Sequence, residues 1–261
     1  MIEKIEGLNT QYAHRAPIGF SGDDVYMIPQ GYQGKDVVVK MARRKEVYEE
    51  GKNLQWLQPY IRVPIVYQMG KIDEYYFVIM ESLPGKMLQD YLIVDTIESI
   101  IRLYAKAIRV FHTIPITGIP YNHSLQQKLE DVKRNVTTGS ITNQFFEPEF
   151  NGLSPEQLHE RLQKERIVED DLVLCHGDVC MPNLIVDSQN TVGYIDVVQL
   201  GVSDRHLDIA IGLRSLRYNL KQIGKTLTND YIALFIESYG MSKMSKDKIL
   251  FYILLDELTK G

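Results

Sequence analysis

Three polar side chains in the second half of the chain have the types and spacing that phosphoryl transfer needs. Asp178 ends the run Leu174–Asp178, Asn183 follows five residues later, and Asp196 ends the run Gly193–Asp196. One aspartate can orient an attacking hydroxyl and accept its proton, while asparagine and a second aspartate hold Mg²⁺ on the nucleotide phosphates. The plainer alternative is a turn-rich loop, because Asp and Asn also favour turns. We predict Asp178 as the catalytic base and Asn183 and Asp196 as the Mg²⁺ ligands.

Short apolar runs would place these side chains at the ends of strands. Leu172–Leu174 predicts a buried strand that leads into the loop carrying Asp178. Leu184–Val186 and Val192–Ile195 predict a hairpin. That hairpin would return Asp196 to the side of the loop, so the carboxylates and the carboxamide would converge.

A second set of residues upstream fits the same chemistry. The β-branched run Asp36–Met41 predicts a strand that carries Lys40, and Glu46–Leu57 predicts the helix that follows. Glu50 shares the inward face of this helix with its apolar residues, so it can pair with Lys40. The order of these groups is that of the protein kinases, with His-Gly-Asp in place of His-Arg-Asp. In that arrangement Lys40 contacts the phosphates and Glu50 fixes Lys40.

Longer motifs resemble one kinase family closely. His176–Asn183, Tyr194–Asp196, Gly201–Arg205 and Asp208–Ala210 are similar to segments of the aminoglycoside phosphotransferases, which modify antibiotics on a protein-kinase-like fold. The ending Tyr252–Leu258 resembles that of the kanamycin and neomycin kinases, the aminoglycoside 3′-phosphotransferases. The resemblance spans nearly the whole chain.

The resemblance implies an α+β, two-lobed fold. Residues 1–82 would form a small, mostly antiparallel β lobe with one helix, which binds the nucleotide. Residues 83–261 would form a larger helical lobe with the catalytic and substrate-binding groups. The enzyme would transfer a phosphoryl group from ATP, with GTP as the alternative donor, and would need Mg²⁺.

The resemblance also implies where the nucleotide would bind. Ser21 lies in a glycine-bearing turn that would cover the phosphates, since glycine permits close backbone approach. Glu81 and Leu83 would meet the adenine edge through their main chains. Val38 and Ile195 would sandwich the base.

The substrate implied by the resemblance is a small cationic aminoglycoside of kanamycin or neomycin type. Asp256 and Glu257 would bind its ammonium groups, because carboxylates offset the desolvation of cations. A solvated acidic pair near a frayed terminus is the alternative. Within the family, a streptomycin 3″-phosphotransferase competes, since its loop resembles Cys175–Asn183. A choline or sugar kinase and a non-catalytic nucleotide-binding regulator also stay open.

Two departures from the family bear on these predictions. The family commonly has a Gly-Arg pair after the residue that matches Asp196, and here the chain reads Val197–Gln199. The missing arginine removes a cation from beside the catalytic carboxylates. Tyr218–Asn219 stands where kanamycin-type enzymes have acidic residues.

Bulk properties set the remaining expectations. The chain has 261 residues, 44% hydrophobic content and a net charge of −5, which suit one globular enzyme and disfavour a nucleic-acid partner. No apolar run approaches a bilayer span, and the start Met1–Glu6 is charged, so we expect a cytoplasmic protein without membrane contact. We expect a monomer or weak dimer.

Two further features have plain interpretations. Cys175 and Cys180 are too few for a disulfide scaffold and lack the spacing of a zinc site, so they are predicted to be small buried hydrophobes. The basic run Arg43–Lys45 predicts a solvated loop.

Overall fold

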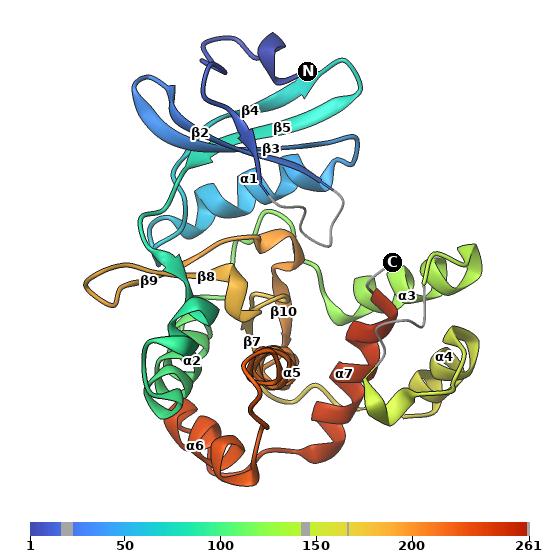
Figure 1. The fold of residues 1–261 in the computed structure, drawn as a ribbon. Coiled ribbons are helices and arrows are strands. Elements are labelled where there is room, and N and C mark those ends of the chain that lie inside the picture. The colour runs from blue at the N-terminus through green and yellow to red at the C-terminus, as the bar shows by residue number, and fades with distance from the viewer. Residues whose placement is uncertain (17–22, 142–146, 166, 260–261) are drawn as a thin grey trace. The chain divides into compact units, whose positions relative to one another are not determined.

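The computed structural model describes residues 1–261 apart from residues 17–22, 142–146, 166 and 260–261 (Figure 1). The chain forms two compact units that do not follow a single cut in the sequence. The first unit comprises Met1–Lys86, Gly118–Tyr121 and Leu184–Val198. The second unit comprises Met87–Thr117, Asn122–Asn183 and Gln199–Gly261. The lobe boundary expected between residues 82 and 83 stays a prediction.

The first unit is built on a five-stranded antiparallel sheet in the order β1-β2-β3-β5-β4 (Figure 1). Its strands are β1 His14–Arg15, β2 Asp24–Tyr32, β3 Lys35–Ala42, β4 Val66–Ile72 and β5 Tyr75–Glu81. One helix, α1 Glu46–Leu57, contacts β3, β4 and β5. The strand over Asp36–Met41 and the helix over Glu46–Leu57 were predicted correctly.

The alternation of side chains along β3 explains why one face of this sheet carries Lys40 while the other packs in the apolar core. Val37, Val39 and Met41 belong to an apolar cluster with Ile79 of β5. Successive side chains of a strand point to opposite faces, so Lys40 lies on the face that α1 covers. A strand of this kind therefore buries an apolar row while it aims its lysine at the helix.

The predicted hairpin is confirmed, and it belongs to the first unit. Its strands are β8 Leu184–Val186 and β9 Val192–Tyr194, which pair antiparallel with Leu184 opposite Tyr194. The N–H of Tyr194 donates to the main-chain oxygen of Arg62 at 2.9 Å. This bond fixes the strand that leads directly to Asp196.

The second unit is mostly helical. Its helices are α2 Ile97–Phe111, α3 Leu125–Thr138, α4 Pro155–Lys164, α5 His206–Gln222, α6 Asn229–Tyr239 and α7 Lys246–Thr259. Its paired strands are β7 Leu172–Cys175 and β10 Gly201–Asp204. The short elements of the whole chain are β6 Lys86–Met87 and the 3₁₀ helices η1 Ile2–Lys4, η2 Leu88–Ile93, η4 Pro148–Phe150, η5 Met181–Asn183 and η6 Val197–Gln199.

Capping residues mark the starts of two helices in this unit. Thr96 accepts a hydrogen bond from the N–H of Ser99 at the start of α2. Ser154 and Gln157 form a reciprocal capping box at the start of α4. Asp204 ends β10, and its carboxylate accepts from the N–H of His206, the first residue of α5.

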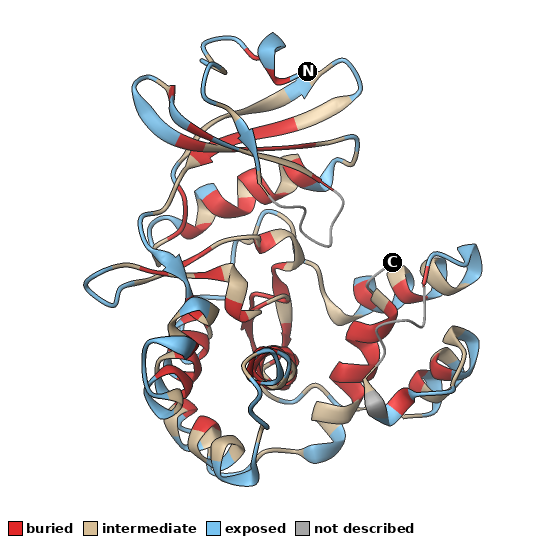
Figure 2. Ribbon diagram, in the orientation of Figure 1, coloured by how far each residue is buried: buried red, intermediate tan, exposed pale blue. Residues whose placement is uncertain are grey.

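The core of the second unit surrounds α5, which is buried along most of its length (Figure 2). Helices α2 and α7 pack on it, and α2 also packs on α6. The observed sheet and helices confirm the α+β class. In the described part of the chain, every helix is too short or too polar to cross a bilayer.

Candidate active site

Lys40 of the first unit is surrounded by carboxylates. Its Nζ lies 2.9 Å from Oε2 of Glu50, 2.9 Å from Oδ1 of Asp196 and 3.5 Å from Oδ2 of Asp23. The predicted Lys40–Glu50 pair is therefore confirmed. Burial alone would lower the pKa of Lys40, but the carboxylates outweigh it and raise that pKa well above its ordinary value. Lys40 is thus held as a cation.

Asp23 and Arg44 were missed as site residues. The Arg44 side chain donates to both carboxylate oxygens of Asp23, with Nε at 2.7 Å from Oδ1. The expectation that Arg43–Lys45 is wholly solvated is wrong for Arg44, which is half-buried because it pairs with the buried Asp23. The only sequence signal was an acidic residue directly after the glycine-bearing turn.

Asp196 combines an unusual backbone with a partly open side chain. It has a φ of 59°, in the left-handed region that non-glycine residues rarely occupy. Its side chain is 35% exposed, although one oxygen contacts Lys40. The side chain of Asn53 donates to the main-chain oxygen of the next residue, Val197, at 3.3 Å. Neighbouring contacts therefore hold Asp196 in a strained conformation, which is a feature of functional sites.

The charges around Lys40 fit a divalent cation. Asp23, Glu50 and Asp196 carry three negative charges, and Lys40 and Arg44 carry two positive charges. The cluster is left with one net negative charge. Mg²⁺ prefers carboxylate oxygens, so Asp196 has the chemistry expected of its ligand.

The residues expected at the adenine edge lie where β5 ends. The N–H of Glu81 donates to the main-chain oxygen of Ile65 at 2.8 Å, and the Glu81 carboxylate accepts two hydrogen bonds from Arg62. Leu83 is half-buried two residues further on. These contacts fix the path of the chain at the position where we expect the base to be read.

The remaining expected nucleotide contacts are also in the first unit or outside the described residues. Val38 on β3 and Ile195 after β9 are both half-buried apolar side chains. Ser21 lies among residues 17–22, outside the described part of the chain. Its assignment to the phosphates stays a prediction.

Asp178 and Asn183 lie together in the second unit. Nδ2 of Asn183 donates to the main-chain oxygen of Asp178 at 2.8 Å and to its Oδ2 at 3.1 Å. Sγ of Cys180 lies 2.9 Å from Oδ1 of Asp178. The prediction that Cys180 is a buried hydrophobe is therefore wrong, because it is half-buried and donates to the carboxylate. Cys175 is buried, as expected.

Asp208 of α5 holds the loop before Asp178. Its oxygens accept from the N–H groups of His176 at 2.8 Å and Gly177 at 2.9 Å, and one oxygen lies 3.0 Å from Nε2 of His112. Burial would raise the pKa of Asp208, but its bond to His112 and the surrounding charges lower it. Nδ1 of His176 accepts from the N–H of Asp178 at 3.3 Å, so His176 orients the backbone of this loop.

Asp256 and Glu257 are buried beside Arg214, so the alternative of a solvated acidic pair is wrong. The Arg214 guanidinium contacts Asp256 and lies 2.9 Å from Oε1 of Glu257. The same guanidinium lies 2.9 Å from Oε1 of Glu147. Burial raises the pKa of Glu257 to about 7, against the opposing effect of Arg214.

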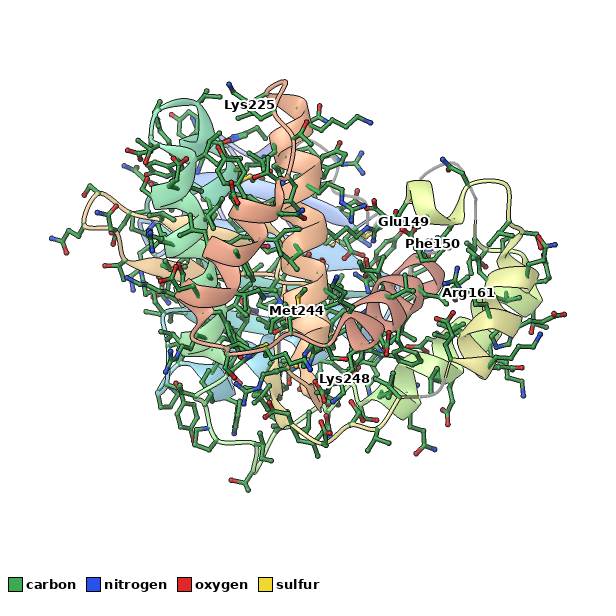
Figure 3. The ribbon with its side chains drawn as sticks, turned by 90° about the horizontal axis from the view of Figure 1, so that it is seen from below. Glu149, Phe150, Arg161, Lys225, Met244 and Lys248 are labelled. Atoms are coloured by element: carbon green, nitrogen blue, oxygen red, sulfur yellow. The ribbon has the colours of Figure 1, made fainter. Side chains whose placement is uncertain are left out.

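The acidic cluster continues onto the segment that precedes α4. Arg217 lies 2.9 Å from Glu147 and 3.1 Å from Glu149. The next residue, Phe150, is fully buried, and the Arg161 guanidinium lies 5.5 Å from its ring centroid (Figure 3). Phe150 therefore anchors a segment whose acids the sequence analysis did not single out.

The chain matches the phosphotransferase enzyme family over residues 14–241. It is 34% identical to an aminoglycoside 3′-phosphotransferase of Niallia circulans, over 92% of this chain and 90% of that protein. It is 31% identical to one of Streptomyces fradiae, over 94% of both. The streptomycin 3″-kinase of Streptomyces griseus is 30% identical over 60% of this chain and 59% of that protein.

A solved structure extends the similarity to the whole fold. The crystal structure of an aminoglycoside-3′-phosphotransferase of type VIII superposes with a TM-score of 0.82 at 27% identity, covering 98% of this chain and 95% of that one.

Proposed function

Since this chain belongs to the phosphotransferase enzyme family, we propose that it transfers the γ-phosphoryl group of ATP to a hydroxyl of an aminoglycoside, and so confers resistance to the antibiotic. The observation that carries the proposal is the contact of Lys40 with both Glu50 and Asp196. Kinase chemistry needs this lysine fixed by one carboxylate and close to the metal-binding one. A protein that only binds nucleotide has no physical need for the full set.

Asp178 is the proposed base. Its two carboxylate oxygens accept from Cys180 and Asn183, so the carboxylate is held in one orientation. An ionised carboxylate is a hydrogen-bond acceptor, so this side chain has the chemistry needed to take the proton of the substrate hydroxyl. The side chain is therefore both oriented and able to act, as general-base catalysis requires.

Asn183 and Asp196 are the proposed Mg²⁺ ligands. When bound, Mg²⁺ would offset the negative charge of the nucleotide phosphates. The net negative charge around Lys40 supports a cation at Asp196. For Asn183, support comes from its hydrogen bond to Asp178, which would keep the metal ligand and the base close together.

Lys40 must exchange one contact when a nucleotide binds. An ammonium has three N–H donors, and Lys40 already faces Glu50, Asp196 and Asp23. Asp23 lies furthest from Nζ, at 3.5 Å, and it is also held by Arg44. We therefore expect a phosphate oxygen to take the place of Asp23.

The substrate is proposed to be of kanamycin or neomycin type. Support comes from two 3′-phosphotransferase relatives, at 34% and 31% identity, and from the acidic cluster of the second unit. That cluster sets four carboxylates, those of Glu147, Glu149, Asp256 and Glu257, against the two guanidinium groups of Arg214 and Arg217. Even with Glu257 partly protonated near neutral pH, the cluster keeps a net negative charge, which suits a substrate with several ammonium groups. Arg214 and those ammonium groups would share the carboxylates of Asp256 and Glu257.

The test is an ADP-release assay of the purified protein with kanamycin, neomycin, streptomycin and choline, run with and without Mg²⁺. We expect Mg²⁺-dependent turnover with kanamycin or neomycin. Turnover with streptomycin alone would move the assignment to a 3″-kinase, and turnover with choline alone would reject an antibiotic substrate. Mass spectrometry of the product should show one added phosphoryl group.

A further inference from the structure

Lys128 on α3 is a buried lysine that the proposed chemistry does not use. Lys128 is 3% exposed. Its Nζ donates to Oε1 of Gln199 at 2.7 Å and to the main-chain oxygen of Gln199 at 3.4 Å. Both acceptors are neutral. A buried ammonium is costly unless it is well paired, and burial lowers the pKa of Lys128 to about 8.

Gln199 connects this lysine to the catalytic loop. A Cβ added to Gly177 would lie 2.2 Å from the main-chain oxygen of Gln199, and Gly177 has a φ of 83°. The same carbonyl oxygen accepts from Lys128. The same oxygen thus packs on the residue before Asp178 and accepts from a buried ammonium.

We propose that Lys128 is a positioning residue for phosphoryl transfer. Through the main chain of Gln199 it holds the end of η6 against Gly177, and so fixes the loop that carries Asp178. The inference rests on the proposed function in one respect, which is the role of Asp178 as the base. Through Lys128, α3 would contribute to catalysis without having to contact the substrate.

The charge of Lys128 is part of this role. Four groups from the surrounding elements act on the ammonium, namely Cys175 of β7, Asp208 of α5, Asp256 of α7 and Asp178 of the loop. Their negative charge, when ionised, favours the protonated lysine. A cation at this point therefore attracts the same loop that its hydrogen bonds position.

The kinetic test compares Lys128→Met, Lys128→Gln and Lys128→Arg with the wild type. We expect kcat to fall between about ten- and hundredfold in the methionine variant, because small misplacements of a reacting group have effects of this size. The arginine variant should retain more activity than the glutamine variant. The KM for ATP should change less than about twofold, since Lys40, Glu50 and Asp196 belong to the first unit. Lys133→Gln, at an exposed position on the same helix, is the matched control.

Exchanging the two side chains tests whether Lys128 and Gln199 act as a pair. Lys128→Gln combined with Gln199→Lys keeps one ammonium and one amide in the same buried place. Gln199→Lys alone puts two ammonium groups together. We expect the double variant to recover kcat beyond the product of the two single effects, as coupled residues do. Independent, multiplicative losses would overturn the pairing.

Hydrogen exchange of the backbone of residues 172–183 reads the loop without any substrate. We expect faster exchange in Lys128→Met than in the wild type and the Lys133→Gln control. Equal exchange, or wild-type kcat in Lys128→Met, rejects the positioning role. An inactive wild type would reject the proposed function alone, while the exchange measurement would still decide the role of Lys128.

Discussion

Asn183 is bound to Asp178 twice, once at the main-chain oxygen at 2.8 Å and once at the carboxylate at 3.1 Å. One amide nitrogen donates both bonds, so the loop between the two residues closes into a small ring. The amide oxygen is then the atom proposed to bind Mg²⁺. The proposed metal ligand and the proposed base are therefore tied to each other, which would remove a source of misalignment before the reaction.

Replacing Asp178 by Asn should lower kcat by about a hundredfold or more, since an amide cannot accept the substrate proton. The Kd for MgATP should change little, because Lys40 and Glu50 belong to the first unit. Steady-state kinetics and calorimetry measure the two effects. Asp230→Asn, the same change at an exposed position of α6, is the control. Turnover near the wild-type rate would exclude Asp178 as the base.

Replacing Asp196 by Ala should remove the Mg²⁺ dependence of nucleotide binding, because a carboxylate oxygen is the ligand Mg²⁺ prefers. Calorimetry would compare ATP with Mg²⁺ and ATP with a chelator, for both proteins. We expect the variant to bind ATP equally weakly in both conditions, and the wild type to bind it much more tightly with Mg²⁺. A Mg²⁺ effect of wild-type size in the variant would place the metal elsewhere.

Local periodicity was enough to predict much of the first unit. The strand with Lys40, the bounds of α1 and the inward face of Glu50 follow from residue spacing within one element, and the structure confirms them. The hairpin before Asp196 follows for the same reason. Such patterns depend only on residues that are close in the sequence, so they can be recognised without knowing the tertiary packing.

Contacts between distant segments could not be predicted in this way. Arg44 meets Asp23 across a strand pair, and Lys128 meets Gln199 from a different element altogether. Nothing in the local pattern of Lys128 distinguishes it from a solvated lysine on a polar helix. The burial of Glu257 similarly depends on Arg214, which lies on another helix. Partners of this kind are set by the tertiary fold.

Neutralising the acidic pair with Asp256→Asn and Glu257→Gln should raise the KM for the aminoglycoside and leave the KM for ATP nearly unchanged. Each charged hydrogen bond lost would be worth about 1.5–3 kcal/mol. Arg214→Gln is the opposing variant, because it removes the cation that shares both acids. We expect it to lower the KM for the drug. If both variants lose turnover and thermal stability together, the acids only hold Arg214 and do not bind substrate.

The free energy of unfolding should depend on pH through Lys128, and the direction follows because burial lowers the pKa of this lysine. Its pKa in the folded protein is about 8, below the ordinary value of 10.5. Between these values the unfolded chain holds the extra proton, so this group makes the protein more stable as pH rises through that window. The cost of burying the charge is full below pH 8 and vanishes above the ordinary pKa.

Denaturant unfolding of the wild type and Lys128→Met at about pH 7.5 and about pH 9.5 measures this term, because all other titrating groups are shared by the two proteins. We expect the difference in unfolding free energy, wild type minus Lys128→Met, to rise by about 2 kcal/mol from the lower to the higher pH. Lys133→Met, at an exposed position, should show no such change relative to the wild type. Parallel pH profiles for the wild type and Lys128→Met would mean that Lys128 keeps an ordinary pKa in the folded protein. The ammonium would then be solvated or paired rather than buried against the neutral oxygens of Gln199.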